Sequence, residues 1–599
     1  MKISASAAPH ELLRDWAGFL LAIVASALLV VAGGFDIPTW MAVRLKWLEV
    51  VVALLFVAVW IAELVLAVKP GEAARYRRAE WILVFTALGG LALLIFMPSA
   101  LQRIVAEELP EHIGQLGAWL VRLFLFGCVW LQLLRAAEWV LSRGLRAEIL
   151  LAGSFLGIIA VGSLLLMLPS AMAEGVRPLS FPDAIFTATS ATCVTGLVVR
   201  STGGDFSPLG QLIIMGLIQV GGLGIATFVA LLSSFSKKTL PVSQMVAFRQ
   251  LINAPALGDL RRRILGIVMI TLAVEAVGAL LLFFFVDAGG SRLGHLEWAV
   301  FHSISAFCNA GFSLQPDNME SLSANAGAVW TIMGLVVLGG LGFLVIPELL
   351  ALIWRGRSEL LPERSARRGM FELRIFRLSN QSRLSLITTG VLLVIGLVGF
   401  WILEAGGVLG GLSAAESLAA SIFQSVSCRT AGFNTLPVCE FQNATLIFLV
   451  FLMVIGGCPV STAGGIKTVT FAVLLLGLRA LVTGARRIEA FGRSIPARVV
   501  FSALNVFLLY MVAAIFGMLT LAWFHPEFAL RDVFFECFSA LSTVGLSTGI
   551  TPVLGTGGKI VLCVLMFVGR IGPIAMVLSV FQSTRAVNYE FPEEEVVVG

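Results

Sequence analysis

Four short polar turns are the places in this 599-residue chain where backbone chemistry could bind an ion. Each turn ends in a glycine followed by a large apolar residue, in the pairs Gly196-Leu197, Gly311-Phe312, Gly432-Phe433 and Gly545-Leu546. Glycine reaches positive φ without a steric penalty and lets successive carbonyl groups point the same way. A ring of such carbonyls can replace the hydration shell of a monovalent cation. The turns carry no acidic side chain, which argues against a carboxylate ring for divalent ions.

The four turns belong to an internal repeat. Their glycines are separated by 115, 121 and 113 residues, and each follows an amphipathic stretch too short to cross a bilayer. A second shared element comes 24 to 28 residues after the glycine, as Gly221-Gly222, Gly339-Gly340, Gly456-Gly457 and Gly569-Arg570 with Gly572. A single such glycine would indicate only close helix packing. Four at matching positions favour re-entrant turns that line a shared pore, because non-helical backbone at membrane depth must be buried in protein or reached by water.

A polar string interrupts the apolar run 443–482, which is too long for one straight crossing. The string GGCPVSTAGGIKT contains Gly456, Gly457, Pro459, Ser461, Thr462, Gly464, Gly465 and Lys467. Proline and the glycine pairs break a helix, so we expect a small, mobile, polar loop just below the four turns. A nucleotide-binding P-loop is excluded because that motif needs glycine before the lysine, and Ile466 stands there.

Two arginines lie near these elements. Arg570 follows the glycine of the fourth repeat inside an apolar helix, where a buried charge is costly and usually functional or paired. We expect it to donate hydrogen bonds to carbonyls of the polar string. The alternative is a packing arginine that reaches a carboxylate. Arg429 lies beside the third turn, where it either repels extra cations or braces the turn against a carboxylate.

The composition places these turns in a membrane protein. Of the residues, 58% are hydrophobic and 13% are charged, and the mean hydropathy is +0.96. Soluble proteins carry about 25% charged residues, so a soluble enzyme, a disordered chain and a disulfide scaffold are excluded. The cysteines and histidines show no metal-site spacing, and clustered catalytic groups are absent. About twelve apolar segments are predicted to cross the membrane, near 17–35, 47–68, 80–98, 116–141, 149–170, 208–232, 264–287, 327–354, 384–404, 443–482, 500–524 and 557–582.

Charge placement predicts the orientation. Three loops within 237–263, 355–383 and 479–498 hold 19 Lys and Arg residues, whereas the stretches on the opposite side hold only Arg177, Arg292 and Arg531. Basic loops stay in the cytoplasm, so both termini are expected there. The predicted units are a four-helix region (1–146), pore repeats 1 (147–250), 2 (251–378) and 3 with its loop (379–495), and pore repeat 4 with a cytoplasmic tail (496–599).

At these motifs the sequence resembles the Trk/Ktr/HKT family of potassium transporters, over roughly 147–599. The strings that carry the resemblance are CVTGL (193–197), CNAGF (308–312), CRTAGF (428–433), STVGL (542–546), GGCPVSTAGGIKT (456–468) and MFVGRIGP (566–573). The resemblance implies an all-α polytopic membrane protein with four helix–pore-loop–helix repeats around one pseudo-fourfold pore, preceded by four extra transmembrane helices. It assigns a K⁺ selectivity filter to Val194, Thr195, Gly196, Asn309, Ala310, Gly311, Thr430, Ala431, Gly432, Thr543, Val544 and Gly545.

The resemblance also implies how such a protein would work. The string 456–468 would be the intramembrane gating loop. Arg570 would lie beside it, and its hydrogen bonds to loop carbonyls would stabilise the closed gate. The partners would be K⁺, membrane lipid, a second copy in a homodimer, and a cytosolic nucleotide-binding regulatory ring, with no nucleic acid and no organic cofactor. The location would be the bacterial inner membrane. A sodium-permeable or Na⁺/K⁺-symporting relative, with Na⁺ as coupling or activating ion, stays open as the alternative, and a membrane-embedded enzyme is a remote one. Residues 1–146 resemble a voltage sensor poorly, because leucine and cysteine occupy the positions after Arg122 where a sensor needs basic residues.

Overall fold

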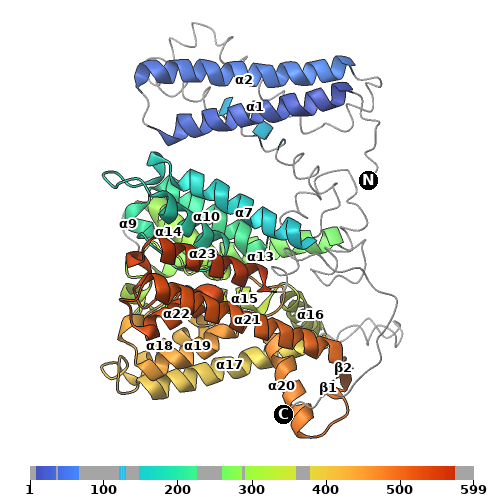
Figure 1. The fold of residues 1–599 in the computed structure, drawn as a ribbon, viewed down its shortest axis with the longest axis vertical. Helices are drawn as coiled ribbons and strands as arrows, with labels where there is room; N and C mark the ends of the chain where they lie inside the picture. The colour runs from blue at the N-terminus through green and yellow to red at the C-terminus, as the bar shows by residue number, and fades with distance from the viewer. Residues whose placement is uncertain are drawn as a thin grey trace.

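The computed structural model describes residues 9–35, 38–66, 147–224, 260–286, 291–358 and 378–573, with some helical residues between 121 and 132. The described chain is almost entirely helical, and its helices lie roughly side by side (Figure 1). Three of its helices are long and apolar enough to cross a membrane, or four if one bent pair is counted as a single span; further apolar helices are shorter. The fold class predicted from the sequence, a helical membrane protein, is therefore confirmed.

Two long helices open the described chain. Helix α1 (Pro9–Gly34) and helix α2 (Thr39–Leu66) lie side by side at the top of Figure 1. Glu49 of α2 is buried, and its carboxylate lies 3.1 Å from Nε of Arg122. Gly34 of α1 packs against the side chain of Leu168, just before the single turn η1 (Pro169–Ala171). The predicted crossing near 80–98 lies outside the described residues, and the one near 116–141 is described only in part.

Four units of similar build follow. Each consists of a long helix, a short helix and a second apolar helix, in chain order α7 (Ala147–Leu166), α8 (Phe181–Thr192), α10 (Pro208–Leu223); α13 (Leu260–Phe285), α14 (Arg292–Phe307), α15 (Ala326–Leu341); α17 (Asn380–Glu404), α18 (Ala414–Ser427), α19 (Asn443–Val454); and α21 (Ala497–Phe524), α22 (Leu530–Leu541), α23 (Thr556–Ile571). Single turns of helix connect them: η1 (Pro169–Ala171), α9 (Thr202–Asp205), η3 (Glu320–Leu322), η5 (Val438–Glu440) and η6 (Thr551–Val553). One continuous hydrophobic core joins all four units.

The short helices α8, α14, α18 and α22 have 12, 16, 14 and 12 residues. At 1.5 Å per residue they reach about 18–24 Å, less than the ~30 Å of a bilayer core. Serine caps three of their N-termini, at Ser180, Ser291 and Ser413, by accepting a hydrogen bond from a backbone N–H of the first turn. All four C-termini stop just before a predicted turn. The expectation of sub-spanning helices is thus confirmed.

One predicted crossing is wrong in detail. The segment near 327–354 was expected to be one span, but α15 ends at Leu341 and α16 (Val345–Ser358) leaves at an angle of 108°. Gly342 ends α15 with a φ of 84°, which favours glycine. The N–H of the next residue, Phe343, donates to the carbonyl of Val460 at 2.9 Å. The helix therefore breaks where the polar string of the third unit packs against it.

The expected break in 443–482 is confirmed. Helix α19 ends at Val454 and α20 (Thr468–Val482) begins after thirteen intervening residues, most of which belong to the polar string. The loop after α20 forms a hairpin that the sequence reading missed, with β1 (Ile488–Ala490) antiparallel to β2 (Arg493–Ile495) and Ile488 opposite Ile495. Its two turn residues, Phe491 and Gly492, both have positive φ, as in the tight turns that suit a hairpin.

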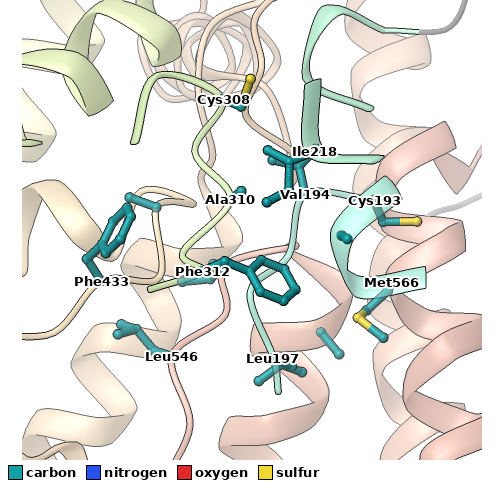
Figure 2. Close-up of a cluster of buried hydrophobic side chains, with 14 of the residues drawn as sticks. Cys193, Val194, Leu197, Ile218, Cys308, Ala310, Phe312, Phe433, Leu546 and Met566 are labelled. Atoms are coloured by element: carbon teal, nitrogen blue, oxygen red, sulfur yellow. The ribbon is translucent and has the colours of Figure 1, made fainter. Parts of the chain in front are cut away.

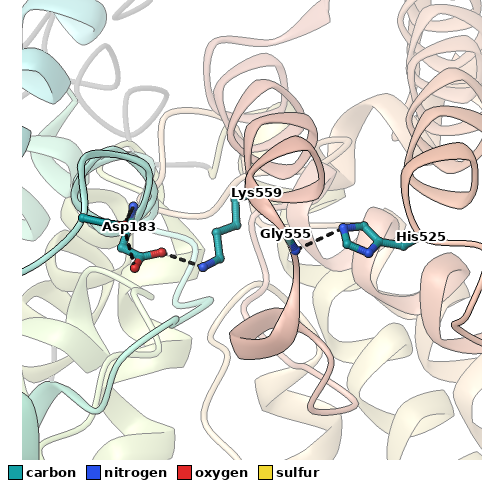
Figure 3. A network of polar contacts seen from close by, with 5 residues as sticks. Asp183, His525, Gly555 and Lys559 are labelled. Carbon is teal, nitrogen blue, oxygen red and sulfur yellow. Dashed lines mark hydrogen bonds and ion pairs between the residues drawn. The ribbon is translucent and has the colours of Figure 1, made fainter.

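The first and fourth units meet directly, which closes the arrangement. Nζ of Lys559 on α23 lies 2.6 Å from the Asp183 carboxylate on α8 (Figure 3). In the same region Nε2 of His525 accepts a hydrogen bond from the N–H of Gly555 at 3.1 Å. The units therefore form a ring rather than a row.

Candidate ion-binding site

The four repeat glycines lie against one another in a closed ring. A methyl group at Gly196 would lie 3.0 Å from Cα of Gly311, one at Gly311 would lie 3.0 Å from Cα of Gly432, one at Gly432 would lie 3.2 Å from Cα of Gly545, and one at Gly545 would lie 3.0 Å from Cα of Gly196. Each methyl group would also press on a carbonyl oxygen of the next turn, those of Ala310, Ala431, Val544 and Thr195 respectively. No side chain fits at these positions.

The backbone of every turn follows the same alternation. The glycines have φ values of 96°, 71°, 77° and 94° in chain order, and the residues two places earlier also have positive φ: Val194 (57°), Asn309 (60°), Thr430 (71°) and Thr543 (52°). Thr195, Ala310, Ala431 and Val544, between them, do not. A left-handed conformation costs a non-glycine residue on the order of 1–3 kcal/mol and persists only where its surroundings enforce it. All twelve predicted filter residues are buried.

A serine near the end of each short helix holds the turn that follows. The hydroxyl of Ser190 accepts from the N–H of Gly196 at 3.1 Å, and the hydroxyl of Ser539 accepts from the N–H of Gly545 at 3.1 Å. In the other two units the serine hydroxyl donates to the carbonyl just after the glycine, from Ser305 to Phe312 at 2.7 Å and from Ser427 to Phe433. The sequence reading missed these serines, although each stands five or six residues before its glycine.

A second polar position lies three residues before each serine and was also missed. Its occupants are Thr187, His302, Gln424 and Glu536, all buried. Nε2 of His302 contacts the Ser313 hydroxyl at 3.1 Å and accepts from the N–H of Leu314 at 3.2 Å. The carboxylate of Glu536 accepts from the hydroxyls of Ser547 and Thr551 and from the N–H of Thr548. In the second and fourth units this position therefore anchors the chain that leaves the ring.

The large apolar residues after the glycines anchor the turns from the other direction. Leu197, Phe312, Phe433 and Leu546 are at most 1% exposed. They come from four separate units and belong to one buried cluster around the turns (Figure 2). The pairing of glycine with a large apolar residue therefore has a packing reason, since the apolar side chain fixes the turn whose backbone must stay in a strained conformation.

The second glycine element packs against the ends of the short helices. A methyl group at Gly221, Gly339 or Gly569 would press on a carbonyl at the end of the short helix of its own unit, those of Thr192, Phe307 and Leu541. In the third unit Gly456 meets the carbonyl of Gly464 instead, because the polar string occupies that space. The helix-packing explanation therefore holds for this second element, while the ring glycines have a separate role in the turns.

The polar string lies directly beside the ring. Gly464 packs against the side chain of Thr543, and Gly456 lies near the methyl group of Thr430. The hydroxyl of Thr462 donates to the carbonyl of Phe307 at 3.2 Å. A short parallel bridge between Ile455 and Ile466 holds the base of the string. Its residues 457 to 463 lie along the end of α15, where the N–H of Cys458 donates to the carbonyl of Gly340 at 2.9 Å.

Arg570 joins this string to the first unit. Its guanidinium group donates to the carbonyl of Thr462 in the string and to the carbonyl of Gly221 at the end of α10. Both contacts are to carbonyl groups, as the gating hypothesis expects, rather than to a carboxylate as the packing alternative expects. Its position follows the packing glycine of the fourth unit, at the place that Gly222, Gly340 and Gly457 hold in the other units.

Two further basic side chains near the ring, Arg429 and Lys467, also bind carbonyls. Arg429 donates to the carbonyl of Gly456 at 3.0 Å and contacts the carbonyl and hydroxyl of Thr389 at 3.5 and 3.4 Å. Arg429 therefore braces this region through carbonyl and hydroxyl groups, and no carboxylate partner is found among the described residues. Nζ of Lys467 donates to the carbonyl of Ala463 at 2.5 Å and folds the string back on itself. Pro459 and Ser461 lie at the tip of the string, and Gly457 and Gly465 lie in its two arms.

Comparison with known proteins agrees with this architecture. The model of the TrkH family, described as cation transport protein, matches residues 138–587. The Ktr system potassium uptake protein B of Bacillus subtilis is 36% identical over 467 residues, which cover 78% of this chain and 99% of that protein. The potassium/sodium uptake protein NtpJ of Enterococcus hirae is 34% identical over 457 residues, which cover 75% and 96%.

A solved structure shows the same fold. The potassium transporter TrkH from Vibrio parahaemolyticus superposes with a TM-score of 0.58 at 19% identity, covering 84% of this chain and 97% of that one. The family comprises membrane transporters rather than enzymes, which fits the apolar helices described above. On its match to three quarters of the residues and its identity to the curated relatives, this chain belongs to the TrkH family of cation transport proteins.

Proposed function

We propose that this protein carries K⁺ across a bacterial inner membrane through the ring formed by its four turns. The observation that carries the proposal is the mutual contact of Gly196, Gly311, Gly432 and Gly545, each preceded by a residue in the left-handed conformation two places earlier. Alternating conformations direct successive carbonyls to one side, and a ring of carbonyls replaces the water around a large alkali cation. The names of the relatives, potassium uptake proteins, support this cargo.

The side chains beside the ring support the same role. The buried hydroxyls of Thr195, Thr430 and Thr543 have no hydrogen-bond partner among the described residues. A buried hydroxyl without a partner is costly in a dry interior, but it is suitably placed to supply oxygen to a passing cation. The short helices end at the ring, so the partial negative charge of their C-termini also favours a cation there.

The string 456–468 acts as the gate in this proposal. Its contacts with Thr430 and Thr543 of the predicted filter, and with Phe307 at the end of α14, support this role. Arg570 holds its Thr462 carbonyl from the first unit, and Arg429 holds its Gly456 carbonyl from the third. Release of these hydrogen bonds would let the string move and open the path below the ring.

The orientation and partners complete the proposal. The positive-inside rule places the hairpin β1–β2 and its arginines in the cytoplasm, together with both termini. A homodimer in contact with membrane lipid and a cytosolic nucleotide-binding ring remain predictions from the family resemblance. The predicted cytoplasmic tail follows residue 573 and lies outside the described residues.

Flux measurements on the purified protein in proteoliposomes test the proposal. We expect Rb⁺ and K⁺ to enter and Na⁺ to be largely excluded. Gly196→Ser should lower the K⁺/Na⁺ ratio by about tenfold or more, equivalent to about 1.4 kcal/mol, because its side chain must displace the Ala310 carbonyl. Gly216→Ser is the matched control, since a side chain there meets open space. Equal uptake of Rb⁺ and Na⁺ by the wild-type protein would contradict potassium selectivity.

Transport of Na⁺, either by permeation or by Na⁺/K⁺ symport, is the second candidate function. It is favoured by the relative NtpJ, whose name includes both potassium and sodium. The same experiment separates the two, because a symporter would need Na⁺ to accelerate Rb⁺ uptake, whereas a selective pore would not.

A further inference from the structure

The four turns of the ring are not equivalent, because one of their glycine carbonyls has a side-chain partner. Nδ2 of Asn318 donates to the carbonyl oxygen of Gly432 at 3.2 Å. For Gly196, Gly311 and Gly545, the structure gives no side-chain hydrogen bond to the carbonyl within the described residues. Asn318 belongs to the second unit and Gly432 to the third, so the bond crosses between neighbouring turns.

Residues 313–320, which we term the strap, hold Asn318 in place. Its carbonyl accepts from the Ser313 hydroxyl at 2.8 Å, and the next residue, Met319, donates from its N–H to the carbonyl of Asn434 at 3.1 Å. The side chain of Asn434 in turn donates to Glu320 at 2.7 Å. The start of the strap rests on His302, which is fully buried.

The conformation of Asn318 also indicates a specific placement. Its φ is 59°, in the left-handed region where asparagine and glycine are the residues best tolerated. Asn318 follows its ring glycine by seven residues, and the residues at the same spacing in the other units are Gly203, Cys439 and Pro552. None of these three carries an amide, so the donor is particular to the second unit.

We propose that Asn318 is a specificity-determining residue of the ring, because its amide fixes the carbonyl of Gly432 and makes the ring asymmetric at that level. This inference rests on the proposed function. A carbonyl that can rotate freely can follow a smaller ion inward, whereas one held by a hydrogen bond keeps the spacing that a larger ion needs. Asn318 therefore favours K⁺ over Na⁺ without lining the path itself.

Two substitutions isolate the donor. Asn318→Asp keeps the shape and tolerates the same φ but replaces the donor with an acceptor, and Asn318→Gly removes the side chain at a φ that glycine adopts freely. Because one hydrogen bond is at stake, we expect each to lower the K⁺/Na⁺ uptake ratio in proteoliposomes about three- to tenfold. Ser313→Ala, which removes one anchor of Asn318, should shift the ratio about twofold in the same direction.

The controls make each outcome decisive. Asp317→Asn changes a charge in the strap whose carboxylate binds Ser321 rather than the ring, and it should leave the ratio unchanged. If the K⁺/Na⁺ uptake ratio changes in Asn318→Asp but not in Asn318→Gly, the effect is due to the added charge, and the inference is overturned. Ratios within twofold of wild type in both folded Asn318 variants would overturn it as well. Loss of Rb⁺ preference in the wild-type protein would instead refute the proposed function, so the two failures are distinguishable.

Discussion

Lys559 on α23 and Asp183 on α8 form an ion pair 2.6 Å long across 376 residues of chain, and each side chain is 14% exposed (Figure 3). The second carboxylate oxygen of Asp183 accepts from the hydroxyl of its N-cap residue, Ser180, at 2.8 Å. The carboxylate is thus fully engaged and oriented. This pair joins the last unit to the first, where no covalent connection does so.

Breaking this ion pair should loosen the closure of the ring. We expect Lys559→Met to reduce the free energy of unfolding by about 1–3 kcal/mol, because it leaves a mostly buried carboxylate without its charged partner. Thermal unfolding in detergent measures the change. A double-mutant cycle with Asp183→Asn should give a coupling of at least about 0.5 kcal/mol. Additive effects of the two substitutions would show that the pair makes no contribution.

Removing the Arg570 clamp should open the gate. In Arg570→Gln the side chain is too short and uncharged to hold both the Thr462 and Gly221 carbonyls, so we expect Rb⁺ uptake without any activating partner to rise about fivefold or more. Arg498→Gln changes an exposed arginine on α21 and serves as the control. Unchanged basal uptake in a correctly folded Arg570→Gln protein would rule out the clamp as a gate.

The carboxylate of Glu536 should stabilise the fourth turn. The two carboxylate oxygens of Glu536 accept three hydrogen bonds. In Glu536→Gln one of these oxygens becomes an NH₂ group, which cannot accept the hydrogen bond that the oxygen received. We expect a loss of about 2 kcal/mol in stability and a reduced K⁺/Na⁺ ratio. Asp532→Asn on the same helix is the control, since it lies outside this network. If both variants unfold at the same temperature as wild type, Glu536 is not an anchor.

Acid should weaken the connection between α21 and α22. Two hydrogen bonds lower the pKa of the exposed Glu527 below its ordinary value of 4.5. The larger effect comes from the His525 ring and the smaller one from a backbone N–H. A carboxyl whose pKa is lowered by folding adds stability above its unfolded pKa, and this stability is lost as the pH falls through the lowered value. Glu527→Gln should therefore flatten the decrease in melting temperature below about pH 4.5. An identical pH profile for the variant would exclude this group as a contributor.

Much of this arrangement could be predicted from glycine spacing. The ring positions were found because Gly196, Gly311, Gly432 and Gly545 repeat with a second element at near-constant distance, and the structure brings all four together. The break around Pro459 was predictable from composition, since a proline flanked by two glycine pairs disfavours a continuous helix.

The features that were missed depend on contacts between units. In the sequence, Gly342 looks like any other glycine of an apolar helix. The helix ends there because the N–H of Phe343 donates to the carbonyl of Val460, which belongs to the third unit. The sequence left open whether Arg429 repels cations or braces its turn against a carboxylate, and it could not show that the polar string offers the carbonyl of Gly456. The serines that hold the turns carried a sequence signal, since they precede each glycine by five or six residues, and extending the repeat by that length would have found them.

Diffraction from the protein crystallised in rubidium chloride tests the central proposal most directly. The ring should bind Rb⁺ in place of K⁺, so an anomalous difference map should show its strongest peaks on the axis enclosed by Gly196, Gly311, Gly432 and Gly545. Crystals of Gly196→Ser should lose or weaken the peak at that level. Rubidium peaks confined to other parts of the protein, with none inside the ring, would contradict the proposal that these four turns bind the transported ion.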